Sequence, residues 1–92
     1  MTSCNIRLSP QITWRKVDRR IVVLNNETQN HYLLNELGGK IWKAITSGKS
    51  LQQTIRSIAR EYAVSHERAE RDVSTFLAGL EAENIISLEK SE

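Results

Sequence analysis

The strongest constraint on the fold is the passage from strand to helix within residues 31–42, HYLLNELGGKIW. Upstream, residues 20–24 form a second strand-like run, and the polar segment 25–29 between the two runs suits a turn. The two runs are predicted to pair as an antiparallel hairpin whose second strand lies at the edge of a sheet. An open edge of that kind can accept a strand from another chain.

Three helices are expected in the second part of the chain. From Asn35 onward, apolar residues recur every three or four positions, the spacing of helices that bury one face. Asn35, Ser50 and Ser65 precede these segments and can accept hydrogen bonds from the helix backbone, so they are predicted N-caps. Gln53 follows Ser50 at the spacing of a capping box. The helices should end near positions 47, 62 and 83.

The order of these elements indicates an α+β fold. Residues 1–34 have extended patterning, the helices follow, and residues 85–88 form a short closing strand. Two helices joined by a tight turn and followed by an extended segment are typical of a winged helix-turn-helix. We predict a winged helix-turn-helix in which an N-terminal three-stranded antiparallel sheet packs on three helices. The 92 residues suit one domain, with mobile tails at residues 1–4 and 89–92.

The charge balance favours no particular macromolecular partner. The chain has 13 basic and 11 acidic residues, and the difference of +2 is too small to attract nucleic acid or an anionic membrane. No apolar run approaches the roughly 20 residues that span a bilayer, and the N-terminus lacks the apolar core of a signal peptide. We therefore expect a cytoplasmic protein with neither a membrane nor a nucleic-acid partner.

Residues suited to catalysis or metal binding do not gather in this sequence. Cys4 is the single cysteine, and His31 and His66 fall on separate elements without a partner at metal-ligand spacing. Gly38 and Gly39 lack the following Lys-Ser/Thr of a phosphate-binding loop. Because glycine costs about 1 kcal/mol against alanine inside a helix, this pair indicates that another element, such as the sheet, approaches closely. We expect no enzyme activity, no catalytic residue, no metal site and no cofactor.

The charge on the third predicted helix argues against DNA binding. A winged-helix regulator would present arginine and lysine on this helix. From Ser65 to Glu83 it carries Arg68 and Arg71 against five carboxylates, so phosphate would repel it. A DNA-binding transcriptional regulator is kept as the alternative binding function.

A peptide-binding domain needs an open strand edge and a neighbouring surface that reads side chains. The edge strand would pair with the peptide backbone, while one flank of the third helix would contact peptide side chains. On that flank, Thr75 and Gly79 leave room, and Arg68 and Asp72 would read charge or, alternatively, form only a surface ion pair. The predicted peptide-binding residues are Asn30, His31, Tyr32, Leu33, Leu34, Arg68, Asp72, Thr75, Phe76 and Gly79.

Taken in order, these features resemble the family of the PQQ-biosynthesis peptide chaperone PqqD over nearly the whole chain. Family members often have glycine before the last strand, whereas this chain has Asn84, which tolerates the same left-handed turn. The resemblance is carried by Trp14 and Asp18 before the strand 21–24, by Tyr32, Leu34, Asn35 and Glu36 leading to Ile41 and Trp42, by the helix from Thr54 and Ile55 to Tyr62, and by residues 69–73 with Phe76, Leu77 and Leu80.

This resemblance implies a small winged helix-turn-helix that recognises the leader region of a ribosomally made precursor peptide. The leader would be held as an added strand, in the cleft between the third strand and the third helix. Stand-alone proteins of this size are similar to the recognition proteins of lasso-peptide pathways, which deliver the precursor to a separate leader peptidase and then to a cyclase. A chaperone of a PQQ-type precursor for a radical SAM enzyme is the alternative within the family. A homodimer through the free edge stays open.

Overall fold

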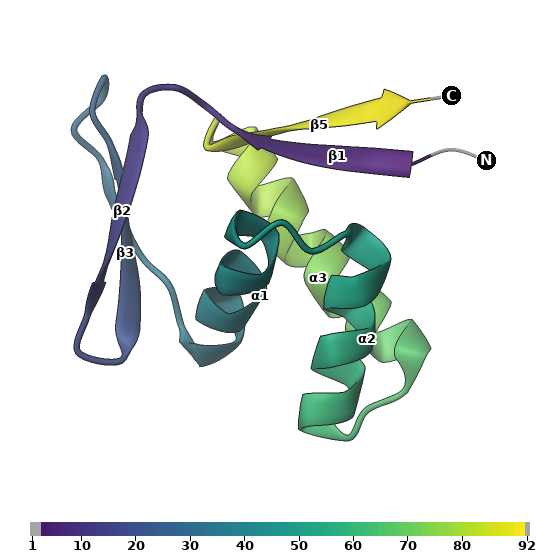
Figure 1. The fold of residues 1–92 in the computed structure, drawn as a ribbon. Coiled ribbons are helices and arrows are strands. Elements are labelled where there is room, and N and C mark those ends of the chain that lie inside the picture. Colours follow the sequence, from purple (N-terminus) through teal and green to yellow (C-terminus); the bar gives the residue numbers. More distant parts are fainter. Residues whose placement is uncertain (1–2, 92) are drawn as a thin grey trace.

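A computed structural model describes residues 3–91 of the chain, and the side chains of residues 6–88. Its elements follow the expected order of strands, three helices and a last strand (Figure 1). They are β1 (Ser3–Leu8), β2 (Ile12–Val17), β3 (Arg20–Asn25), β4 (His31–Leu33), α1 (Glu36–Thr46), α2 (Leu51–Tyr62), α3 (His66–Ala82) and β5 (Ile86–Ser91).

A three-stranded antiparallel sheet with the order β2-β3-β4 forms one layer of the fold. Strand β4 lies at its edge, which confirms the predicted hairpin and the predicted edge. In the register of this hairpin, Val22 lies opposite Leu33 and Leu24 opposite His31. The described chain thus leaves the outer side of β4 without a neighbouring strand.

A second sheet joins the two ends of the described chain. Strands β1 and β5 pair antiparallel, with Ser3 opposite Ser91 and Leu8 opposite Ile86. The side-chain hydroxyl of Ser9 donates a hydrogen bond of 2.7 Å to the carbonyl of Asn84 at the base of this ribbon. The sequence predicted these segments as extended but did not predict that they pair. Of the expected tails, residues 3–4 and 89–91 lie in these strands, and residues 1, 2 and 92 lie outside the described residues.

Each helix begins at the residue predicted to cap it. The Asn35 side chain accepts a hydrogen bond from the backbone N–H of Gly38, and the Ser65 side chain accepts one from Arg68. Ser50 and Gln53 form both hydrogen bonds of a capping box. These caps satisfy donors that the first turn of a helix leaves unpaired, which is why local sequence was enough to find them.

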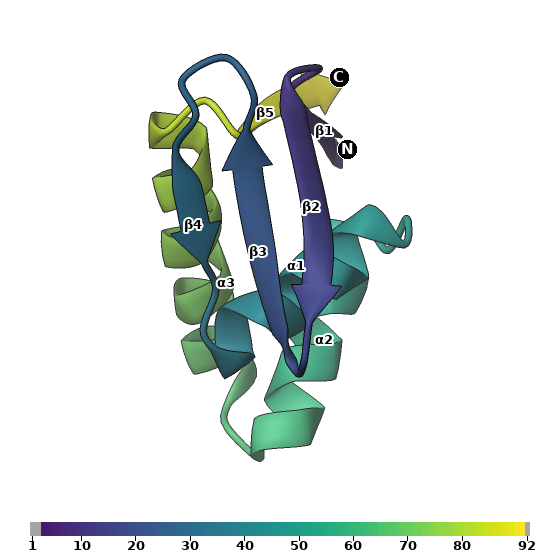
Figure 2. The same cartoon turned by 90° about the vertical axis from the view of Figure 1, so that its left-hand side faces the viewer.

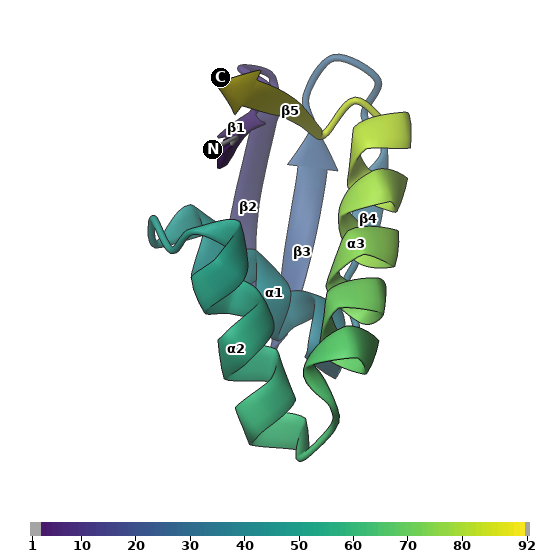
Figure 3. The same ribbon diagram turned by 90° about the vertical axis from the view of Figure 1, so that its right-hand side faces the viewer.

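The helices cover one face of the three-stranded sheet, as Figures 2 and 3 show from opposite sides. Trp42 is fully buried, as expected for a core residue, and the ring of Trp14 from β2 meets it edge-on at 6.0 Å between centroids. The most deeply buried apolar side chains, each at most 1% exposed, include Ile21, Val23, Ile41, Ile55, Val73 and Ile85. No helix among the described residues is long and apolar enough to cross a membrane.

The paired glycines of α1 mark two close approaches. A Cβ atom on Gly39 would lie 3.5 Å from Ile21 of the sheet, and one on Gly38 would lie only 2.8 Å from the ring of Phe76 on α3. The expected approach of the sheet is confirmed at Gly39. At Gly38 the closest neighbour is instead α3.

Two non-glycine residues close the helix ends with left-handed backbone. Ala63 ends α2 with φ of 53°, and Asn84 follows α3 with φ of 59°. Asparagine adopts this region more readily than most residues, because its short polar side chain can bond locally. The expectation that Asn84 replaces a glycine at this turn is therefore confirmed.

Candidate peptide-binding site

The hydrogen bonds between β3 and β4 fix which backbone groups of β4 face outward. The N–H of Asn25 donates to the carbonyl of Asn30, and the N–H of Leu34 donates to the carbonyl of Ile21, both at 3.0 Å. Because bonded and non-bonded pairs alternate in an antiparallel ladder, Tyr32 also bonds to β3. The N–H and C=O groups of His31 and Leu33 therefore point to the open side of the sheet.

Side chains of β4 alternate between the two faces of the sheet. Leu33 is 59% exposed and His31 is also exposed, whereas Tyr32 is half-buried on the helix side. The Tyr32 hydroxyl donates a hydrogen bond of 3.1 Å to the Glu83 carboxylate, just past the end of α3. This bond ties the edge strand to the C-terminal end of α3.

One stripe of α3 faces β4 and the beginning of α1. Asp72, Phe76, Gly79 and Glu83 follow one another at steps of four, three and four residues, so they share a face of the helix. Phe76 contacts α1 at Gly38, directly after β4, and Glu83 contacts Tyr32 of β4. Gly79 lies between Phe76 and Glu83 in this stripe and must therefore face the same side of α3 as they do.

Open space lies at the middle of this stripe. A Cβ atom on Gly79 would meet no heavy atom within 4 Å, although Phe76 and Glu83 on either side of it both contact other elements. Gly79 is thus an exposed position of α3 with open space around it, between Phe76 and Glu83 along the stripe. Thr75 is exposed on the same flank of α3.

The N-terminal half of α3 lies differently. Arg68 and Asp72 form an ion pair with 3.9 Å between Nε and Oδ2, in which the Arg68 side chain is 70% exposed. This is the surface pair that the sequence offered as the alternative to charge reading. Toward this end α3 inclines away from the three-stranded sheet (Figure 1), so the pair is not brought together with β4.

The first and last residues of the predicted strand already use backbone groups for hydrogen bonds within the fold. Leu34 is 7% exposed and its N–H is bonded to Ile21, while the Asn30 carbonyl is bonded to Asn25. Of the predicted residues 30–34, the structure leaves the backbone of His31 and Leu33 open for pairing. Fewer residues are open than predicted because hydrogen-bonded and non-bonded positions alternate along the strand. Which positions are bonded depends on the register.

A polar pocket of about 200 Å³ lies between the β3–β4 loop and the end of α3. Sequence analysis did not find it. Spacing could have indicated Glu83, which follows Gly79 by one helical turn, but the loop residues carry no such signal. Residues that line the pocket include Asn25, Glu27, Thr28, Asn30, Tyr32 and Glu83.

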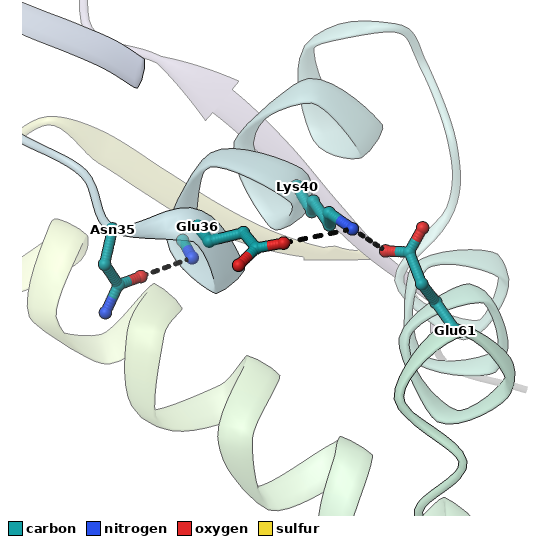
Figure 4. A network of polar contacts seen from close by, with 5 residues as sticks. Asn35, Glu36, Lys40 and Glu61 are labelled. Atoms are coloured by element: carbon teal, nitrogen blue, oxygen red, sulfur yellow. Dashed lines mark hydrogen bonds and ion pairs between the residues drawn. The ribbon is translucent and has the colours of Figure 1, made fainter. Parts of the chain in front are cut away.

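A charged network on the other side of α1 holds that helix in place (Figure 4). The Lys40 ammonium lies 2.7 Å from the Glu61 carboxylate of α2 and 3.7 Å from Glu36, and 5.3 Å from the centre of the Tyr62 ring. Its hydrogen bond with Glu61 raises the pKa of Lys40 against a smaller opposing effect of desolvation. Glu36 directly follows the Asn35 cap, so the network stabilises the first turn of α1. This is the turn that Phe76 contacts.

A second lysine in α1 has the opposite environment. Hydrogen bonding and repulsion from the neighbouring Lys16 of β2 lower the pKa of Lys43. Within the residues whose side chains are described, no cluster of histidine, cysteine, aspartate or glutamate is arranged to hold a metal ion. The arrangement around β4 offers backbone pairing, an aromatic wall and carboxylates, which are means of binding a peptide.

Comparison with known proteins places this arrangement in a family. Among curated proteins, none matches the chain significantly. A solved structure of TbiB1 in complex with the TbiA(beta) leader peptide is 26% identical, with a TM-score of 0.84 over 88% of this chain and 94% of that one. A lasso peptide synthetase B1 complexed with the leader peptide is 24% identical and shares the fold, with a TM-score of 0.84 over 90% and 98%. The model of coenzyme PQQ synthesis protein D (PqqD) matches residues 20–86, more than half of the 92, and the chain therefore belongs to the PqqD family.

Proposed function

We propose that this protein is a non-catalytic domain that binds the leader region of a ribosomally made precursor peptide by adding it as a strand to β4. The observation that carries the proposal is the open backbone of His31 and Leu33 at the edge of the three-stranded sheet. The two similar structures, which are complexes with leader peptides, support leader binding by a domain of this fold. The bound strand would gain hydrogen bonds from the edge and side-chain contacts from α3.

The energetics require more than backbone pairing. A disordered leader loses about 2–5 kcal/mol of the interaction energy when it becomes ordered. Sub-micromolar to nanomolar affinity corresponds to roughly −8 to −12 kcal/mol net, so one or two buried apolar anchors are needed. Half-buried Phe76 and exposed Leu33 border the site and would supply apolar contact for them.

We place the protein in lasso-peptide biosynthesis, where it would deliver the precursor to a separate leader peptidase. Support comes from the similarity to a lasso peptide synthetase B1 over 90% of this chain. A chaperone of PQQ-type precursors for a radical SAM enzyme would use the same edge, and the family model is compatible with it. The genes beside this one distinguish the two roles, since they encode either a peptidase and a cyclase or a radical SAM enzyme.

The helices α2 and α3 and strand β5 follow one another in the order of a winged helix-turn-helix, and we interpret the domain as one that binds peptide in place of DNA. In a DNA-binding winged helix, α3 would enter the major groove with basic residues. Here its exposed residues include Glu67, Glu70 and Glu81. Phosphate would be repelled by this surface.

Fluorescence anisotropy separates the two binding functions. A labelled leader peptide from the precursor gene beside this one is titrated with the protein at physiological salt, in parallel with a labelled DNA duplex. We expect saturable binding of the leader and only weak, salt-sensitive binding of the duplex. Tight duplex binding without a response to the leader would overturn the proposal in favour of a regulator.

A further inference from the structure

The polar pocket beside Tyr32 has a strongly one-sided charge. Among its lining residues, Glu27 and Glu83 carry carboxylates, and none carries a positive charge. Glu27 belongs to the β3–β4 loop and Glu83 to the end of α3, so the two acids come from segments far apart in sequence. A ligand group in this pocket would be attracted if it is cationic and repelled if it is anionic.

The Asn25 side chain adds a hydrogen-bond donor to the pocket. The Asn25 side chain lines the pocket, and the residue is 3% exposed. Its Oδ1 atom accepts hydrogen bonds from the N–H groups of Glu27 and Thr28, at 2.9 and 3.1 Å, which orients its Nδ2 amide. Within the described part of the chain, this Nδ2 amide donates to no protein acceptor. A carbonyl oxygen of a ligand in the pocket would satisfy it.

The position of the pocket connects it to the peptide edge. Tyr32 lies in its wall, between His31 and Leu33, whose backbone groups face outward. The Tyr32 hydroxyl bonds to one oxygen of Glu83, Oε2, and leaves the other oxygen, Oε1, available to a ligand. A strand paired with β4 would therefore pass directly beside the pocket.

We propose that this pocket binds a lysine or arginine side chain of the leader peptide, between Glu27 and Glu83, while the Asn25 amide donates to a carbonyl of the same peptide segment. The inference rests on the proposed function and adds a specificity-determining site to it. A basic residue satisfies both features, because it supplies a cation at its tip and a carbonyl in its backbone. An acidic residue would face two carboxylates, which makes the pocket a filter against acidic leaders at this position.

Substitution in both partners tests the inference. Each lysine and arginine of the leader from the neighbouring precursor gene is replaced by alanine, one at a time, and each peptide is titrated against four proteins. These are the wild type, Glu27→Gln with Glu83→Gln, Asn25→Ala, and the control Glu81→Gln, which removes an exposed carboxylate of α3 outside the pocket. A glutamine side chain at position 83 would still accept the hydrogen bond from Tyr32, so the double variant is expected to fold.

We expect one basic leader position whose replacement weakens binding at least tenfold in the wild type and in Glu81→Gln. In the double variant the same replacement should change affinity less than twofold, because the carboxylates are gone. A glutamate at that leader position should bind still more weakly to the wild type and should recover in the double variant. Asn25→Ala should weaken every leader by a similar factor, since it loses the contact to the peptide backbone and also the acceptor that holds the loop at Glu27 and Thr28.

The outcomes separate this inference from the function on which it rests. If the intact leader binds saturably but no basic position shows a coupled loss, the pocket does not read a basic residue and the inference is wrong. Saturable binding of a leader that contains no lysine or arginine would also show that the inference is wrong. If the intact leader does not bind at all, the proposed function fails, and this inference fails with it.

Discussion

The hydroxyl of Tyr32 donates a hydrogen bond of 3.1 Å to the carboxylate of Glu83, which lies 51 positions later in the chain. It connects the edge strand to the end of α3, the two sides of the candidate site. Because Tyr32 is fixed by its pairing with β3, the bond also fixes the distance between the strand that would receive a peptide and the helix that would contact it.

Replacement of Tyr32 by phenylalanine should loosen this connection. The variant loses a partly exposed hydrogen bond, so the free energy of unfolding should fall by about 1 kcal/mol. Urea denaturation measures this fall in the free energy of unfolding. The control is Tyr62→Phe, which keeps the ring beside Lys40 and should unfold like the wild type. Equal stability of the two variants would show that the Tyr32 bond contributes nothing.

Proline at His31 should weaken leader binding at least tenfold without unfolding the protein. It removes an N–H that points to the open side, and edge strands tolerate proline there. The same alternation of hydrogen bonds makes the Lys16 N–H point outward on the opposite edge, in β2, so Lys16→Pro is the matched control. Anisotropy titrations should show loss of affinity only for His31→Pro. An equal effect of both prolines would remove β4 as the pairing edge.

A larger side chain at the exposed Gly79 should have different effects on stability and on leader binding. Gly79→Ala should raise the free energy of unfolding by up to about 1 kcal/mol, because the added Cβ meets nothing and glycine is a poor helix former. Gly79→Leu should fold as well but bind leader at least tenfold more weakly. Ala78→Leu, at the neighbouring exposed position of α3, is the control for a larger side chain. Unimpaired binding by Gly79→Leu would mean that the peptide does not contact α3 at this position.

The two adjacent glycines of α1 should respond differently to alanine. At Gly39 the new Cβ would make an ordinary contact of 3.5 Å with Ile21, so the gain in helix propensity should stabilise the protein. At Gly38 it would lie 2.8 Å from the Phe76 ring and 3.1 Å from the oxygen of the Asn35 cap. Gly38→Ala should therefore be less stable than Gly39→Ala in thermal unfolding. The reverse order would show that the Phe76 ring moves away without cost.

The Lys40 network should make stability depend on alkaline pH. Its partner Glu61 raises the pKa of Lys40 above the usual 10.5, so this contribution is present below about pH 10.5 and is lost as the pH rises through the raised value. Glu61→Gln lacks the ion pair. The difference in unfolding free energy between wild type and variant should therefore shrink as the pH rises above about 10.5 in urea titrations. A constant difference over this range would contradict the assignment.

Local chemistry explains how much of the fold could be predicted from sequence. The N-caps Asn35, Ser50 and Ser65 act within three residues of themselves, and the change of period at Leu34 marks the strand-to-helix junction directly. The pairing of β1 with β5 joins residues at opposite ends of the described chain, and no local pattern specifies such a contact.

The candidate site shows the same division. Helical spacing was enough to place Thr75 and Gly79 on one flank of α3 with Arg68 and Asp72. It could not show that the half of α3 with Arg68 and Asp72 inclines away from the sheet. The pocket depends on the turn after β3 and the end of α3, which only tertiary packing brings together. Nothing in the sequence therefore indicated that Glu27 and Glu83 line the same pocket.

The pairing of β1 with β5 has a consequence for how this domain can be attached to others. Ser3 and Ser91 lie opposite each other at one end of that ribbon. Figure 1 shows the ribbon running along the helices, with the ends marked N and C pointing away from the three-stranded sheet. An enzyme or a fluorescent protein fused at either terminus would thus be joined away from the edge that receives the leader. The domain is also suited to insertion into a larger polypeptide, because its two neighbouring ends can both be joined to the host chain. Its peptide-binding edge would then stay free.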